Sequence, residues 1–219
     1  MASRVLLPLM LVLAVGSGAT AQALVDARAL LQMFMQSPLH DQLVRDALAR
    51  FPPDVFQRCP ALVSKGSTVH VEEAISVGAD GLPNAGAWKQ SFPVSGCGND
   101  TTLNIYFVAS SQEIRTVIAA PGDTLADPRL QADGLKYAVV AAAQTARTCQ
   151  RFEITNTRWD GYDRSSAGEP LPAPGAKPKV AWNETWTLTG CGMAYDVPMT
   201  FVPQTVGTVI GAAPAVAHH

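Results

Sequence analysis

The twelve residues AWKQSFPVSGCG occupy positions 87–98, and they return as AWNETWTLTGCG at positions 181–192. The offset of 94 residues continues without a gap to Phe107 and Phe201. Within each copy the large apolar side chains are separated by even numbers of residues, which places them on one face of a strand. The stretch therefore predicts the same half-buried strand twice in one chain, with its tryptophans in the core rather than on a ligand platform.

Other landmarks repeat at almost the same spacing. Cys59 precedes Cys149 by 90 residues, and the same number separates Ser37-Pro38 from Asp127-Pro128. The chain is therefore predicted to contain two copies of one unit. Their expected limits are residues 37–121 and 127–214, after an N-terminal helix at 22–36 and before a disordered tail at 215–219.

Each unit is expected to open with a helix. Ser37 and Asp127 each place a capping side chain before a proline, which is tolerated in the first helical turn because its missing N–H has no partner there. The first helix should end near Arg50, ahead of two prolines, and the second near Arg147. Four short alternating patterns follow in each copy. The predicted fold class is α+β, a tandem duplication of a helix plus four-stranded antiparallel sheet unit.

The N-terminal stretch has the features of a secretory signal peptide. Arg4 supplies a positive charge, residues 5–15 form an apolar run, and Ala19-Thr20-Ala21 is a small-x-small cleavage site. The apolar run is shorter than the roughly 20 residues that span a bilayer. Residues 1–21 are therefore expected to be removed, and the mature chain to be periplasmic or secreted in a bacterium, without membrane insertion.

All four cysteines lie in the part expected to be exported. An even number of cysteines in an oxidising compartment favours disulfides over metal binding or thiol catalysis. Because each unit can then fold with its own bridge, the repeat favours pairing Cys59 with Cys97 and Cys149 with Cys191.

The composition excludes two broad classes. The chain has 219 residues, of which 47% are hydrophobic, and a formal net charge of -2. Disorder requires low hydrophobicity, and nucleic-acid binding usually requires a clustered excess of Lys and Arg. Removal of Arg4 with the signal peptide makes the chain slightly more acidic, so no nucleic-acid partner is expected.

The motifs of the common reaction classes do not occur in the sequence. It contains no G-x-S-x-G, S-x-x-K, H-E-x-x-H, C-x-x-C, G-x-G-x-x-G or P-loop pattern. His40 stands near a helix start. His70 lies on the polar face of an early strand, where a solvated or locally hydrogen-bonded role is expected. Glu72 and Glu73 are adjacent in a strand and point to opposite faces, so they do not flank one bond. No catalytic residue, metal site or cofactor is expected.

One segment is much longer than its counterpart in the other copy. Trp159 is expected to end a strand and to open residues 160–179, which correspond to the shorter stretch 78–86. A long loop on a rigid scaffold is the best place to look for function. The candidate binding residues are Trp159, Tyr162 and Arg164.

The repeated A-W-x-x-x-(F/W)-x-(V/L)-x-G-C-G segment, with a Phe ten residues after its Cys, resembles one in uncharacterised exported proteins of proteobacteria. That resemblance implies an exported protein and brings no catalytic residues with it. The tandem plan with two disulfides is also similar to the architecture of β-lactamase-inhibitor proteins, and each unit is similar to a cystatin. These similarities concern the fold and not a shared site.

The leading functional hypothesis is an exported, non-enzymatic binding or structural protein with an unidentified protein or envelope partner. An inhibitor of a secreted or periplasmic enzyme is its sharper form. One alternative is an enzyme with an unfamiliar site, using Asp160, Asp163 and Arg164 on the long segment or Glu73 in the sheet. Another alternative is a small-molecule carrier with an apolar cavity between helices and sheets.

Overall fold

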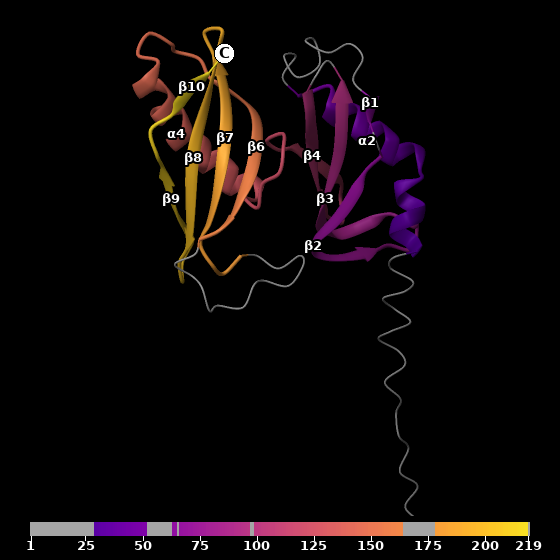
Figure 1. The fold of residues 1–219 in the computed structure, drawn as a ribbon. Coiled ribbons are helices and arrows are strands. Elements are labelled where there is room, and N and C mark those ends of the chain that lie inside the picture. Colours follow the sequence, from indigo (N-terminus) through magenta and orange to yellow (C-terminus); the bar gives the residue numbers. More distant parts are fainter. Residues whose placement is uncertain (1–28, 52–62, 65, 97–98, 164–177, 219) are drawn as a thin grey trace, which may run out of the picture.

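Two units stand side by side in the computed structural model, and each is an antiparallel sheet with helical structure on one face (Figure 1). The structure describes residues 29–51, 63–64, 66–96, 99–163 and 178–218. The predicted signal peptide, Cys59 and Cys97 lie outside the described residues.

The first unit consists of helices followed by sheet A. Residues 29–35 are helical, and α2 (Pro38–Leu48) follows, with the Ser37 side chain accepting a hydrogen bond from the backbone N–H of His40 as its N-cap. β2 (Thr68–Val77), β3 (Pro83–Gly96), β4 (Asn99–Ala109) and β5 (Ile114–Ile118) then form an antiparallel meander. The short β1 (Val63–Ser64) pairs with the far end of β3, beside β2.

The second unit repeats this order. Helix α4 (Pro128–Thr145) is capped by Asp127, and sheet B follows with β6 (Glu153–Tyr162), β7 (Trp182–Gly190), β8 (Met193–Pro203) and β9 (Thr208–Ala212). A fifth strand, β10 (Val216–His218), pairs with β8 beside β9.

The predicted α+β class, with a helix and an antiparallel sheet in each of two consecutive units, is confirmed. Each sheet has five strands instead of four, because two strands share one edge position: β1 and β2 beside β3, and β9 and β10 beside β8. The predicted disordered tail was wrong for residues 216–218. These residues form β10, and His218 pairs with Asp196 at 3.2 Å, so backbone and side-chain contacts to β8 hold the tail.

The repeated tryptophans lie in the core, as their spacing predicted. Trp88, Trp182 and Trp186 are each at most 2% exposed. Trp88 stacks on Phe107 at 5.0 Å, and Trp182 stacks in the same way on Phe201 at 4.9 Å. The two units therefore build equivalent sheet-to-helix cores from equivalent sequence positions.

Gly134 allows α4 to approach the sheet closely. A Cβ at this position would lie 2.7 Å from Cη2 of Trp186, whose indole is fully buried and has no room to move. Alanine in a helix interior is normally about 1 kcal/mol better than glycine. Here we expect Gly134→Ala to destabilise the protein by about 1–2 kcal/mol in urea unfolding, because overpacking outweighs helix propensity.

The matched background for this substitution is Trp186→Phe, which removes the part of the ring that faces Gly134. In that background Gly134→Ala should become neutral or stabilising. A destabilisation of equal size in both backgrounds would show that the indole is not the cause.

A disulfide joins Cys149, after the end of α4, to Cys191 in the turn between β7 and β8. The Cα atoms are 5.8 Å apart, and the bridge closes a loop across 42 residues. Gly190 precedes it, because a Cβ there would lie 2.6 Å from the carbonyl oxygen of Arg151 and 3.0 Å from Cys149 Sγ. The second predicted pairing is therefore confirmed, and the repeated G-C motif has a packing reason in this copy.

The segment between the units is largely buried and hydrogen-bonded to both of them. Residues 119–122, 124 and 126 are buried. On the first unit, the side chain of Asn104 donates hydrogen bonds to the carbonyls of Ala120 and Gly122 at 3.0 and 2.9 Å. On the second, the hydroxyl of Thr157 donates to the carbonyl of Pro121 at 2.8 Å. Because both units bind the same few residues, this linker sets their relative position.

Candidate functional site: a cleft between the two units

A cleft of about 1050 Å³ lies between the two units. Its first wall is the face of sheet A that points away from the helices, and its second wall belongs to the second unit. Such a volume is at the upper end of the range for small-molecule sites. The principal side chains lining the first wall are Thr68, His70, Glu72, Lys89, Ser91 and Tyr106.

The first wall is polar because successive residues of a strand alternate between the two faces. Trp88, Gln90 and Phe92 face the helices, so Lys89 and Ser91 face the cleft. The strand register aligns these residues with their neighbours in two rows across the sheet. One row is Thr68, Ser91 and Asn104, and the next is His70, Lys89 and Tyr106. Side chains of directly paired residues have Cβ atoms about 5 Å apart.

Tyr106 is the most deeply buried polar side chain of the second row. It is 7% exposed and lines the cleft, yet its hydroxyl makes no hydrogen bond to any described residue. Burial raises the pKa of Tyr106, and the negative charges of Glu72, Asp127 and Glu184 raise it further. The hydroxyl therefore remains a protonated phenol at neutral pH.

The second wall is formed by the start of α4, the end of β6 and the turn between β8 and β9. Arg129 and Asp133 come from the first turns of α4, and Tyr162 comes from β6. Asp133 is paired with Lys136 at 2.8 Å. Among the described residues, Arg129 on this wall and Lys89 and Glu72 on the other form no ion pair. Within the described part of the chain, one acidic and two basic side chains of the cleft therefore lack an ion-pair partner.

Two of the three predicted binding residues are in contact with each other, and one of them, Tyr162, lines the cleft. Trp159 is 39% exposed, and its ring meets that of Tyr162 edge to face at 5.5 Å. Arg164 lies outside the described residues.

The position of Trp159 differs from the prediction. The strand does not end there, since β6 continues to Tyr162. A register shift between Trp159 and Gly161 interrupts the alternation of side chains along β6, and the rings of Trp159 and Tyr162 are in contact across it. Asp160 is therefore a strand residue, where Arg158 and Thr185 donate hydrogen bonds to it at 2.8 and 2.6 Å.

The acidic residues of the alternative enzyme hypothesis do not converge. Glu73 is exposed and does not line the cleft, whereas its neighbour Glu72 does. The backbone N–H of Asp163 donates to Ala181 at 2.7 Å, which extends the pairing of β6 with the β7 side. Glu72 and Glu73 are thus separated as predicted.

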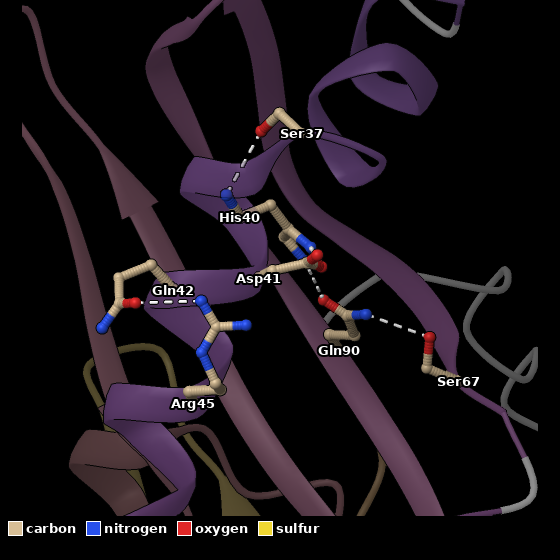
Figure 2. Close-up of polar contacts among 7 residues, drawn as sticks. All are labelled: Ser37, His40, Asp41, Gln42, Arg45, Ser67 and Gln90. Carbon is tan, nitrogen blue, oxygen red and sulfur yellow. Dashed lines mark hydrogen bonds and ion pairs between the residues drawn. The ribbon is translucent and has the colours of Figure 1, made fainter.

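A second polar cluster lies in the core of the first unit and not in the cleft. Figure 2 shows His40 of α2 and Gln90 of β3 directed at each other, with Nε2 and Oε1 2.8 Å apart, and Gln90 donating to Ser67 at 3.0 Å. His40 is 5% exposed and packs between Phe34 and Phe107. This chain of contacts ties α2 to the sheet, so His40 has a structural role in the core of the first unit.

The position equivalent to Gln90 in the second unit is Glu184. It is 1% exposed, and its carboxylate accepts four hydrogen bonds. Two come from the indole N–H groups of Trp182 and Trp186 and two from the linker, at the Thr124 hydroxyl and the Leu125 backbone N–H. Glu184 therefore connects the sheet B core to the segment that positions the cleft.

Sequence reasoning missed Lys89, Ser91 and Tyr106 as site residues. The strand pattern around Trp88 identified the buried face of β3, and the alternate positions of the same strand contained the signal. The pattern gives no information about the position of the second unit, which lies opposite that face. The cleft exists because the linker places the start of α4 and the end of β6 there.

No helix among the described residues is long and apolar enough to cross a membrane. Within the same residues, no three His, Cys, Asp or Glu side chains are grouped so as to hold a metal ion. Protein-family models, curated proteins and solved structures were compared with the chain, and none of them matches it.

Proposed function

We propose that this chain is an exported, non-enzymatic binding protein whose ligand enters the cleft between its two units. The observation that carries the proposal is the cleft wall itself. One face of sheet A presents two rows of hydroxyl, imidazole, ammonium and phenol groups to a volume of about 1050 Å³. Convergent polar groups in a large concave site are typical of a ligand site.

The buried linker supports a site that is formed before the ligand arrives. Both units hydrogen-bond to residues 120–122, and Glu184 holds residues 124 and 125. A preformed cleft avoids the entropic cost of ordering its walls on binding. The Cys149–Cys191 disulfide and the signal-peptide pattern support export, because disulfides persist in oxidising compartments.

A cleft-filling variant tests this proposal. Thr68 is exposed at the start of β2 and lines the cleft, so Thr68→Trp should occupy the volume without disturbing the core. In a thermal-shift screen of polar metabolites and short peptides, a ligand at 100 times its Kd should stabilise the protein by about 2.7 kcal/mol. That corresponds to roughly 5–10 °C in Tm.

The shift should be lost in Thr68→Trp and kept in Gln112→Trp, which places the same side chain in the exposed turn between β4 and β5. The proposal fails if no compound in the screen stabilises the protein. It also fails if the stabilising compounds act equally on both variants.

A protein partner is the second candidate, and one observation favours it. Trp159 is an exposed large aromatic that is held rigid by Tyr162, and such anchors often dominate protein interfaces. Inhibition of a secreted or periplasmic enzyme is the sharper form of this candidate. Trp159→Ala should then abolish co-purification of the partner from envelope extract. Tyr137→Ala, a 50% exposed aromatic on α4, should not.

A further inference from the structure

The hydroxyl of Tyr106 lies in the cleft without a hydrogen-bond partner among the described residues. The side chain is more than nine-tenths buried, lies in the middle of the polar wall and makes no hydrogen bond to any described residue. Among the described residues, the buried side-chain atoms without a hydrogen-bond partner are Nδ1 of His40 and Nε1 of Trp88, so the oxygen of the Tyr106 hydroxyl remains accessible from the cleft. A ligand that enters the cleft therefore meets a hydroxyl that is available for a hydrogen bond.

The charges around Tyr106 indicate what that ligand carries. Of the acidic residues that act on the phenol, Glu72 has the strongest influence, followed by Asp127. Glu72 forms no ion pair with any described residue. A group that approaches the Tyr106 hydroxyl therefore enters a negative potential, which favours a cation that donates hydrogen bonds.

A positive group lies beside Tyr106 in the same row. Lys89 is the direct cross-strand neighbour of Tyr106, and its ammonium has no carboxylate partner among the described residues. On the opposite wall, Arg129 also forms no ion pair with any residue that the structure describes. Unpaired anionic and cationic side chains on one preformed cleft match a ligand with charges of both signs.

We infer that the cleft binds a zwitterionic, peptide-like ligand, with its ammonium group at Tyr106 and Glu72 and its carboxylate at Lys89. This inference rests on the proposed function, because it names the ligand class of the same cleft. The phenol oxygen accepts a hydrogen bond from the ammonium group, and Glu72 supplies the opposite charge. A volume of about 1050 Å³ has room for a short peptide rather than a single ion.

The test uses one pool of random tripeptides in four forms: free termini, N-acetylated, C-amidated, and blocked at both ends. Binding is followed by the backbone amide signals of Thr68, His70 and Lys89 in ¹⁵N-labelled protein, which report on the cleft itself. The free pool should bind best. Acetylation and amidation should each weaken binding about tenfold or more, since each removes one charged contact.

Three conservative variants assign the contacts. Tyr106→Phe should weaken binding of the free pool about tenfold. Glu72→Gln should remove the preference for free over acetylated peptides and leave the preference for acid over amide. Lys89→Gln should remove the preference for acid over amide and leave the preference for free over acetylated peptides. Melting temperatures and spectra of the unbound variants show that each is folded.

The outcomes separate this inference from the proposed function. If free tripeptides do not shift the cleft signals, or if the blocked pool binds equally well, the zwitterion inference is wrong. In that case, neutral or anionic compounds that stabilise the wild type but not Thr68→Trp would leave the proposed function standing. An unchanged acetylation preference in Glu72→Gln would also overturn the assignment of the ammonium contact.

Discussion

Replacement of Glu184 by alanine should lower the free energy of unfolding by about 3–5 kcal/mol. The carboxylate is fully buried and accepts from four donors. Without it, the indole N–H groups of Trp182 and Trp186 and the backbone N–H of Leu125 lose their acceptor, and none of the three is able to turn elsewhere. Only the hydroxyl of Thr124 is free to rotate.

Glutamine at the same position should be less harmful than alanine. Its amide NH₂ replaces one acceptor oxygen with a donor, so at least one indole N–H or backbone N–H must face it. The orientation with the smaller loss turns the NH₂ toward Thr124 and Trp186, because the threonine hydroxyl is also able to accept. We expect Glu184→Gln to cost about 1–3 kcal/mol.

Glu153→Ala is the matched control for both variants. Glu153 is also a glutamate in sheet B, but it is partly exposed and paired with Arg151 at the surface, where a pair contributes at most about 1 kcal/mol. Urea unfolding gives the energies, and the indole N–H signals of Trp182 and Trp186 report the lost hydrogen bonds directly. An alanine variant that loses no more stability than Glu153→Ala would refute the role given to this carboxylate.

The local elements were predictable from the sequence because their causes are local. Proline after a capping residue correctly predicted where α2 and α4 begin. The period of two around Trp88 and Trp182 predicted which side chains are buried. The prediction of a disordered tail from residue 215 was wrong, because Val216 and His218 acquire strand structure only from pairing with β8, which is remote in sequence.

The candidate site was only partly predictable, since it depends on contacts between the two units. Strand alternation alone predicts that His70 lies on the polar face of its strand. It also predicts that Glu72 and Glu73 point to opposite faces. Tyr106 gains its importance from burial against the second unit and the linker. The role of Glu184 was equally difficult to predict, because a glutamate in a strand pattern usually indicates an exposed position. Its buried role depends on two tryptophans and on a linker that no periodicity describes.

The linker also makes Gly122 a position where a single methyl group should have a large effect. Gly122 has a φ of +100°, and a Cβ there would lie 2.0 Å from the carbonyl oxygen and 2.5 Å from the nitrogen of Thr157. Both contacts are backbone atoms of β6, so no side-chain rotation relieves them. Its own N–H donates to Thr102 at 2.7 Å, and its carbonyl accepts from Asn104, so the residue is also held from the first unit.

We expect Gly122→Ala to cost about 3–5 kcal/mol, as backbone strain and steric overlap each contribute about 1–3 kcal/mol. Gly81→Ala separates the two causes. Gly81, in the turn between β2 and β3, has a φ of +79° with nothing within 4 Å of the added Cβ, so it should show the strain alone, at about 1 kcal/mol. Equal losses of stability in the two variants would mean that the contact with β6 is unimportant.

The same pair of variants links the stability of the linker to the site. In Gly122→Ala the first unit and β6 no longer fit together at the linker, so the two walls of the cleft lose their fixed separation. Ligand binding should therefore fall more steeply in Gly122→Ala than in Gly81→Ala, which does not line the cleft, at a temperature where both are folded. Unfolding by urea should also lose cooperativity, with sheet B signals and sheet A signals changing at different concentrations. A single shared transition with full ligand affinity would show that the units are held together by contacts other than this linker.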